Sequence, residues 1–186
     1  MRVIAGKLKS RQLKSVDSKL TRPTTDKNKE NLFNMIGPYF QGGTCLDLFA
    51  GSGGLGIEAI SRGMDQLYSV DKQYRAFLTV KDNVKALKIE DVVHIYKMDY
   101  WKALLKFAQE NICFDLVLLD PPYSMKVHQK ILDFLVENHM LNDDCIIVIE
   151  DLKEEVIDVK EPFILKKQQI YGITSLQILI YKENKS

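Results

Sequence analysis

The order of apolar and amphipathic segments constrains the fold of this chain more than any other feature of its sequence. From residue 44 onward, short apolar runs alternate with longer stretches whose apolar residues recur at helical spacing. The runs are TCLDLFA, QLYSVD, VVHIYK, FDLVLLD and CIIVIE, and the helical stretches lie near 54–63, 73–87, 100–110 and 126–139. A strand followed by a helix, repeated along the chain, predicts an open parallel sheet with helices on both faces.

The C-terminal part of the chain departs from this alternation. The segment FILKKQQIYGITSLQILIYK predicts two strands around Gly172, a hairpin with no helix between its strands. A sheet that ends in this way is one of a few arrangements, and the sequence does not fix its strand order. The 186 residues are enough for one domain with a sizeable core.

A further helix is expected ahead of the first strand. The segment TRPTTDKNKENLFNMIG has apolar residues at helical spacing near its end. Thr25 or Asp26 can cap the N-terminus of this helix, and Gly37-Pro38 ends it.

The N-terminal segment carries a basic excess. Residues 1–30 hold nine Lys or Arg and three Asp or Glu, a local charge of +6 in a chain whose net charge is +1. We predict a basic extension over residues 1–25, folded as a β-hairpin and packed on a core domain of residues 26–186. A phosphate backbone would attract such an arm, because neutralising the phosphates with Lys and Arg releases their counterions. A pair of solvated strands explains the charge equally well.

A glycine-rich loop, DLFAGSGGLGIEAI, follows the first apolar run and opens a helix. Gly51, Gly53 and Gly56 match the pattern G-x-G-x-x-G, and Asp71 lies 20 residues past Gly51 at the end of the next strand. These features match the dinucleotide fingerprint, in which the strand-terminal carboxylate binds a ribose. A tight turn without a ligand is the alternative reading.

Asp47 argues against a dinucleotide, because it lies directly before the loop, where a pyrophosphate would bring two negative charges. A carboxylate at this position suits a ligand with a cationic end. S-adenosylmethionine offers an ammonium and a sulfonium to Asp47 and a ribose to Asp71. Asp99, two residues after VVHIYK, is a candidate partner for the adenine amino group, and an exposed helix N-cap explains it equally well.

The stretch LLDPPY places an acid, two prolines and a tyrosine at the end of the fourth strand. The exocyclic amine of a nucleobase is a poor nucleophile, because its lone pair is delocalised into the ring. Two acceptors on its N–H bonds favour the tetrahedral geometry needed for attack on a methyl group. Asp120 supplies a carboxylate, and Pro121 supplies a C=O that Pro122 holds in an extended conformation. Tyr123 offers a ring face to an extruded base. A proline-rich loop closing the strand is the alternative, and it leaves the acid and the tyrosine unexplained.

These motifs resemble a known family, the RsmD-like bacterial methyltransferases that modify guanine N2 in 16S rRNA. The resemblance covers essentially the whole chain and rests on RVIAGKLKSRQL, TRPTTDKNKENLFN, DLFAGSGGLGIEAISRG, LLDPPY and YGITSLQILIYK. DPPY alone marks the wider class of amino methyltransferases, and RPTTD ahead of DLFAGSG is more specific. The resemblance implies a Rossmann-like class I methyltransferase fold, with a seven-stranded, mostly parallel sheet ending in an antiparallel hairpin.

The resemblance also implies S-adenosylmethionine as methyl donor and 16S rRNA as partner, in the small ribosomal subunit or an assembly intermediate. The residues that it places at the cofactor are Asp47, Phe49, Gly51, Gly53, Asp71, Asp99, Arg22 and Thr24. It places Asp120, Pro121, Pro122 and Tyr123 at the target amine. The candidates for RNA contact are Arg2, Lys7, Lys9, Arg11 and Lys14. The chain departs from the family at Gly54, where alanine is usual, and at Tyr100-Trp101, where smaller residues are common.

Three other functions stay open at this point. A DNA or RNA adenine-N6 methyltransferase would use the same four residues, although the chain has no spare length for a separate target-recognition region. An NAD-dependent oxidoreductase would give Asp120 no role, and a noncatalytic RNA-binding factor would need the basic arm alone.

We expect a cytoplasmic protein without a membrane partner, since no apolar run approaches the roughly 20 residues that span a bilayer. The oligomeric state is open, and a monomer is the default expectation. Metal binding has little support, because the three histidines form no close pair.

Overall fold

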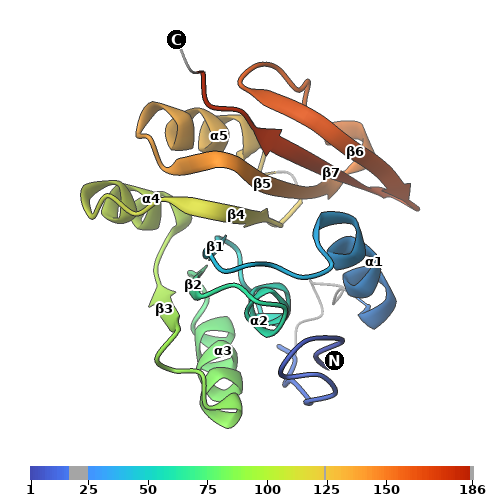
Figure 1. The fold of residues 1–186 in the computed structure, drawn as a ribbon, viewed down its shortest axis with the longest axis vertical. Helices are drawn as coiled ribbons and strands as arrows, with labels where there is room; N and C mark the ends of the chain where they lie inside the picture. The colour runs from blue at the N-terminus through green and yellow to red at the C-terminus, as the bar shows by residue number, and fades with distance from the viewer. Residues whose placement is uncertain (17–24, 124, 185–186) are drawn as a thin grey trace.

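The protein, described here in a computed structural model over residues 1–16, 25–123 and 125–184, is built around one seven-stranded sheet (Figure 1). The strand order is β3-β2-β1-β4-β5-β7-β6. The strands that pair in parallel are β1 (Thr44–Asp47), β2 (Gln66–Asp71), β3 (Val93–Lys97), β4 (Phe114–Leu119) and β5 (Leu141–Leu152). β6 (Phe163–Tyr171) and β7 (Thr174–Tyr181) form an antiparallel hairpin, and β7 pairs antiparallel with β5. The predicted mostly parallel sheet with its terminal hairpin is confirmed.

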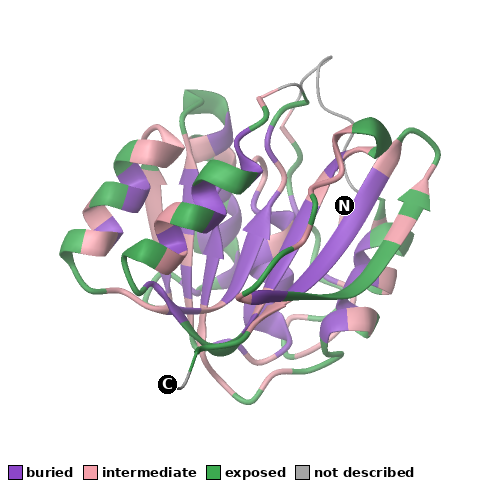
Figure 2. Ribbon diagram, turned by 90° about the horizontal axis from the view of Figure 1, so that it is seen from above, coloured by how far each residue is buried: buried purple, intermediate pink, exposed green. Residues whose placement is uncertain are grey.

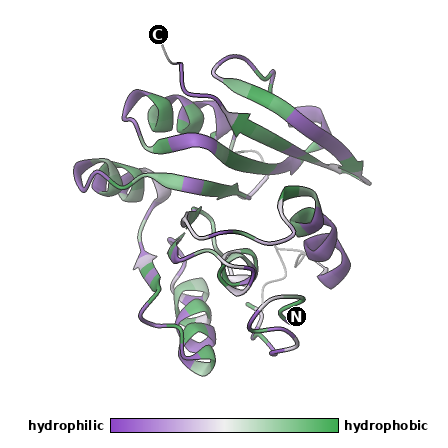
Figure 3. Ribbon diagram, in the orientation of Figure 1, coloured by the Kyte–Doolittle hydropathy of each residue, from purple (hydrophilic) through white to green (hydrophobic). Residues whose placement is uncertain are grey.

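Helices cover both faces of the sheet. They are α1 (Asp26–Ile36), α2 (Gly54–Ser61), α3 (Tyr74–Leu87), α4 (Tyr100–Gln109) and α5 (His128–Glu137), with a short 3-10 helix, η1, at Lys153–Glu155. One buried apolar cluster contains Phe33 of α1, Ile57 of α2 and Val84 of α3, and a second contains Phe107 of α4 and Leu135 of α5. Figure 2 shows the buried strands enclosed by helices whose outer faces are exposed, and Figure 3 shows the matching mixture of hydrophobic and hydrophilic residues along each helix. The sheet is therefore the middle of three layers.

Local sequence signals set the ends of α1 and the shape of β5. The Thr25 hydroxyl accepts a hydrogen bond from the Asn28 N–H at 3.1 Å, so Thr25 is the N-cap, and α1 stops at Gly37 as predicted. β5 runs beyond the apolar stretch CIIVIE at both ends, to Leu141 and to Leu152. Its backbone pairs with β4 on one side and β7 on the other, which extends the strand into polar sequence.

The N-terminal arm, defined here as residues 1–16, folds back on itself and packs against the core. The Val3 N–H donates to the Arg11 carbonyl and the Leu13 N–H to the Met1 carbonyl, each at 2.9 Å. A single antiparallel bridge joins Arg2 and Gln12, and no regular strand forms within these described residues. Val3 and Leu13 are buried in the cluster that also contains α1 and α2. The division at residue 25 into an extension and a core domain stays a prediction.

A buried ionic network, which we call the Glu58 clasp, fixes the arm to α2. The Glu58 carboxylate accepts hydrogen bonds from the N–H groups of Ile4 and Ala5, at 2.9 and 3.1 Å. It also pairs with Arg62 at 2.9 Å and with Lys29 of α1 at 3.6 Å, and the side chains of Glu58 and Lys29 are 0% exposed. Burial lowers the pKa of Lys29, and the Glu58 charge opposes that shift. Lys29 thus counts toward the basic excess of residues 1–30 but is not part of a basic surface.

Two further properties concern the described residues as a set. None of the helices in residues 1–16, 25–123 and 125–184 has the length and apolar character needed to cross a membrane. Over the same ranges, no group of three or more His, Cys, Asp or Glu is arranged to hold a metal ion.

Candidate active site

Four acids among the predicted cofactor-binding and catalytic residues lie at the carboxyl end of the parallel strands. Asp47 ends β1, Asp71 ends β2, Asp99 follows β3 by two residues and Asp120 directly follows β4. The chain leaves β1 for α2 on one face of the sheet and leaves β4 for α5 on the other. Ligands of open α/β sheets bind in the crevice at such a topological switch point. The fold therefore brings these carboxylates together where a ligand is expected.

The glycine loop turns sharply between β1 and α2. Gly51 and Gly53 have φ angles of 56° and 83°, in the left-handed region where a side chain is strained. A Cβ atom added to Gly51 would meet no atom of the described residues within 4 Å, so none of those residues fills the space on this side of the loop. The Gly51 N–H donates to Asp71 at 2.9 Å, and the Asn83 amide of α3 donates to the Ser52 carbonyl at 3.0 Å. Hydrogen bonds to Asp71 and Asn83 thus fix the loop, and the described residues leave the space beside Gly51 unfilled.

Asp47 is a buried carboxyl beneath this loop. Its side chain accepts a hydrogen bond from the Gly56 N–H at 3.2 Å, and the residue is 3% exposed. Burial raises the pKa of Asp47 to about 7, the Gly56 hydrogen bond opposes the rise and the Asp71 charge adds to it. A Cβ atom on Gly56 would lie 2.8 Å from Leu67 and 3.2 Å from the Asp47 carboxylate, so the close packing of α2 on the sheet requires glycine there.

Asp71 and Asp99 both receive backbone hydrogen bonds. The two oxygens of Asp71 accept from the N–H groups of Gly51 and Gln73, each at 2.9 Å, which fixes the carboxylate in place. Asp99 accepts from the Trp101 N–H at 2.9 Å and is the N-cap of α4. The N-cap interpretation of Asp99 is therefore confirmed, and its contact with an adenine stays a prediction.

Aromatic side chains flank these carboxylates. Phe49, within the glycine loop, has its ring 5.4 Å from that of Tyr100, which follows Asp99. Trp101 turns instead toward α5, where its ring lies 4.8 Å from that of Phe134. Of Tyr100 and Trp101, it is thus Tyr100 that lines the region of Phe49 and Asp99.

The segment Asp120 to Tyr123 leaves β4 as an irregular loop. Pro121 is buried, Pro122 is exposed, and Tyr123 is 45% exposed. The Pro122 carbonyl accepts from the Met125 N–H at 3.4 Å, and within the described residues no hydrogen bond reaches the Pro121 carbonyl. Burial raises the pKa of Asp120 well above its ordinary value, and the charges of Glu150, Asp47 and Asp151 raise it further.

Glu150 is a neighbour of Asp120 that the sequence did not identify. In the β4–β5 register Leu118 pairs with Val148 and Leu119 with Ile149, so the next residues along the two strands are Asp120 and Glu150. Side chains two residues apart share a face of a strand, and both acids follow Leu118 and Val148 onto the α1–α2 face. Burial raises the pKa of Glu150. Glu150 ends the apolar run CIIVIE as Asp120 ends FDLVLLD, and this was the one sequence signal for it. The sequence does not fix the strand order, so it could not show that the two acids are neighbours.

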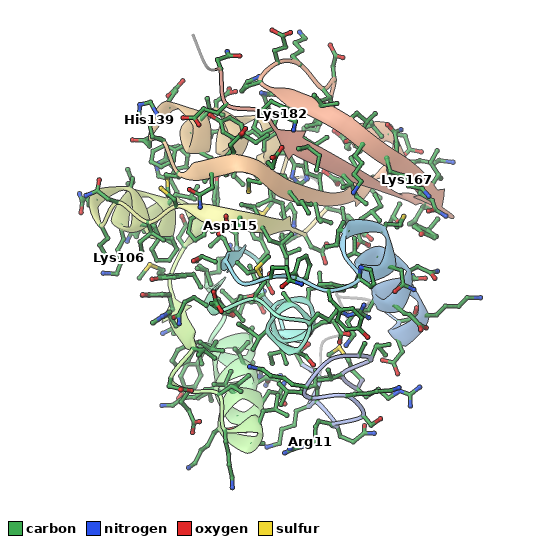
Figure 4. The ribbon with its side chains drawn as sticks, in the orientation of Figure 1. Arg11, Lys106, Asp115, His139, Lys167 and Lys182 are labelled. Atoms are coloured by element: carbon green, nitrogen blue, oxygen red, sulfur yellow. The ribbon has the colours of Figure 1, made fainter. Side chains whose placement is uncertain are left out.

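The remaining predicted residues lie on or after the arm. Arg22 and Thr24 lie outside the described residues. The five candidates for RNA contact, Arg2, Lys7, Lys9, Arg11 and Lys14, are all exposed. Arg2 pairs with Asp26, Lys14 pairs with Asp82, and Arg11 donates to the Ala86 carbonyl, so the arm follows α1 and α3 (Figure 4).

The fold and the strand-end site define a class, that of the Rossmann-like methyltransferases. A solved structure titled "Putative methyltransferase yhhF from Escherichia coli" superposes on the chain with a TM-score of 0.86, at 27% identity and over 99% of each chain. A Haemophilus influenzae protein described as a "putative methylase" superposes with a TM-score of 0.80, at 30% identity and over 98% of each chain.

Within this class, the chain belongs to the family described as "Conserved hypothetical protein 95", whose model matches residues 1–180. It is 45% identical over 184 residues to "Putative rRNA methyltransferase YlbH" of Bacillus subtilis, which covers 98% of this chain and 99% of the relative. It is 34% identical over 182 residues to "Ribosomal RNA small subunit methyltransferase D" of Haemophilus influenzae, covering 96% and 92%. These findings confirm the resemblance to the RsmD-like family.

Proposed function

We propose that this protein transfers a methyl group from S-adenosylmethionine to the exocyclic N2 amine of a guanine in 16S rRNA of the small ribosomal subunit. The observation that carries the proposal is Asp120, an acid at the end of β4 that lies beside a glycine loop at the switch point of the sheet. The names of its relatives, an rRNA methyltransferase and a small-subunit rRNA methyltransferase, support the reaction and the substrate class.

The described residues fit S-adenosylmethionine, which when bound supplies a methyl group activated on a sulfonium. Asp47 is a buried carboxyl without an ion pair in the described residues, and a cationic methionine end would compensate its charge. The open side of Gly51 leaves room for a ligand to approach the backbone. Asp71, held by two backbone N–H groups, is a rigid acceptor for ribose hydroxyls. We assign Phe49 and Asp99 to the adenine end of the same pocket.

Asp120 and Pro121 would prepare the amine for attack. The carboxylate accepts a hydrogen bond from one N–H of the target, and the Pro121 carbonyl accepts from the other, which favours tetrahedral nitrogen. The new N–C bond forms as the S–C bond breaks, and the methylated amine then gives up one proton. A carboxylate with a raised pKa is a suitable acceptor for this proton. The exposed ring of Tyr123 provides a surface for stacking the base.

The arm is assigned to the RNA backbone. Its exposed cations lie on a segment that the Glu58 clasp fixes to α2, so they keep a constant position relative to the site. A rigid arm loses less conformational entropy on binding than a free one. Such a substrate places the protein in the cytoplasm, and we propose that it acts as a monomer.

The test is transfer of labelled methyl groups from S-adenosylmethionine to unmodified small subunits, free 16S rRNA and duplex DNA, with identification of the methylated nucleoside. We expect N2-methylguanosine in subunit RNA, and a rate at least about 100-fold lower for Asp120→Ala, as for loss of a transition-state acceptor. Methylation of adenine, in RNA or DNA, would contradict the substrate and keep the mechanism. A protein that does not bind S-adenosylmethionine would contradict the proposal as a whole.

A further inference from the structure

Three carboxyl groups come together around Asp120 on one face of the sheet. Asp47, Asp120 and Glu150 come at the carboxyl ends of the adjacent strands β1 and β4 and of the neighbouring part of β5. The proposed reaction uses Asp47 for the cofactor and Asp120 for the amine. It gives no role to Glu150, which lies next to Asp120 across the strand pair.

Glu150 differs from its neighbour in sequence, Asp151, in its partners. Asp151, on the opposite face, accepts hydrogen bonds from His128 at 2.9 Å and from the Leu152 N–H at 2.8 Å. In the described ranges, neither a hydrogen bond nor an ion pair is formed by the side chain of Glu150. Among the described residues, Glu150 interacts electrostatically with Asp120, which directly follows β4, and with Tyr171 of β6, whose pKa is raised by burial and by the Glu150 charge.

A carboxylate in these surroundings needs hydrogen-bond donors, because a buried polar group without a partner is costly. Glu150 is neither fully buried nor fully exposed, so a ligand seated at Asp120 can reach it. Since none of the described side chains donates a hydrogen bond to Glu150, we look for its donors on the base that Asp120 and Tyr123 would hold. The glycine loop and the DPPY segment define the site independently of this acid.

Guanine and adenine present different groups beside the amine. In guanine, the N2 amine is adjacent to N1–H, so two neighbouring groups on one edge are donors. In adenine, the N6 amine is adjacent to N1, which is an acceptor. Adjacent strands lie about 4.8 Å apart, so two carboxylates on the same face can converge on neighbouring donors of one base.

We propose that Glu150 accepts a hydrogen bond from N1–H of the target guanine and thereby selects guanine over adenine. This inference rests on the proposed function, since it needs the base amine at Asp120. Against adenine, the carboxylate would face the N1 lone pair and lose its donor. The pair Asp120 and Glu150 then reads the edge of the base, one acid at the amine and one at the ring nitrogen.

The test uses 2-aminopurine, which keeps the N2 amine but has an acceptor in place of N1–H. Small subunits are reconstituted with 16S rRNA that carries guanine or 2-aminopurine at the nucleotide methylated by the wild-type protein. We expect the wild-type protein to prefer guanine in kcat/KM by roughly 10- to 100-fold, the value of one hydrogen bond to a charged group. In Glu150→Gln the amide can either accept or donate, so the preference should fall to within about threefold.

Two controls accompany this comparison. Glu154→Gln, the same substitution on an exposed glutamate of η1, should keep the wild-type preference. Calorimetric affinity for S-adenosylmethionine should be unchanged by Glu150→Gln, because the proposed contact is with the base.

A wild-type protein that methylates both bases equally well would overturn the inference without any variant, as would an unchanged preference in folded Glu150→Gln. Either result leaves methylation of guanine intact. Failure of the proposed function would be seen separately, as absence of N2-methylguanosine with the natural RNA.

Discussion

Acidic side chains in two regions of this molecule have opposite surroundings. Glu58, in the clasp, has two backbone N–H donors and two cations within 3.6 Å. Asp120 and Glu150, at the strand ends, have other acids as neighbours and no ion pair in the described residues. A buried charge with partners is costly to disturb and fixes the fold, whereas one without partners lowers stability until a ligand supplies them. The contrast separates the residues that hold the arm from those expected to do the chemistry.

The largest effect that this contrast predicts is on stability. Glu58→Ala leaves Lys29 and Arg62 as uncompensated buried cations, and we expect the free energy of unfolding to fall by about 3–5 kcal/mol. Denaturant unfolding monitored by circular dichroism measures the change. Asp82→Ala, which breaks the exposed pair with Lys14, is the control and should cost at most about 1 kcal/mol. A loss below about 1 kcal/mol for Glu58→Ala would refute the role given to the clasp.

The second prediction concerns the strand-end acids and is the pH dependence of methyl transfer. Asp120 is a strong hydrogen-bond acceptor and can take up the proton of the amine only when it is ionised, and burial and the charges of the nearby acids Glu150, Asp47 and Asp151 raise its pKa. At saturating S-adenosylmethionine, the rate should rise with pH until it passes the raised pKa, by up to about tenfold per pH unit below it. The amide in Asp120→Asn does not titrate, so the rate of this variant should no longer rise with pH in this range, whatever its absolute value. The same rise in this variant would assign the titration to another group.

A smaller effect is expected from Asp47, on the pH dependence of the affinity for S-adenosylmethionine. Its pKa is about 7 without the cofactor, and a cationic ligand would lower it, so binding below pH 7 releases a proton. Affinity for S-adenosylmethionine should therefore rise about fivefold between pH 6 and pH 7 by calorimetry, and Asp47→Asn should flatten the curve. The unliganded protein should lose stability over the same interval, because a raised pKa in the folded state favours folding only while the group is protonated.

The smallest predicted effects concern the surface of the arm. Lys7→Ala and Lys9→Ala should each weaken RNA binding and reduce the slope of log affinity against log salt by about 0.7–0.9, the value for one phosphate contact. Lys167→Ala, at the other side of the molecule on β6, is the matched control (Figure 4). Equal effects at Lys7 and Lys167 would show that RNA binding is not directed by the arm.

The sequence predicted those parts of the fold that depend on local signals. The apolar runs predicted the strands, and Gly172 predicted the terminal hairpin. Gly37 predicted the end of α1, and Thr25 was one of two candidates for its N-cap. The strand-end acids could be placed at one edge for the same reason, since parallel strands all end on the same side of the sheet.

The features that the sequence did not predict depend on contacts between distant segments. In the sequence, Lys29 is indistinguishable from a surface cation on a polar helix face. Its burial is seen only in the structure, where it pairs with Glu58. In the sequence, Glu150 is only the last residue of an apolar run. Its proximity to Asp120 follows from the strand order, which places β5 beside β4. Neither pairing has a signature in spacing or composition.

The most direct test of the contrast measures unfolding free energy and methyl-transfer rate together for Glu58→Ala and Asp120→Ala. We predict that Glu58→Ala loses about 3–5 kcal/mol of stability and, at a temperature where it is folded, transfers methyl groups within about tenfold of the wild-type rate. Asp120→Ala should transfer at least about 100-fold more slowly, with a free energy of unfolding at pH 8 equal to or above that of the wild type. Parallel loss of stability and rate in both variants would contradict the separation of the two regions.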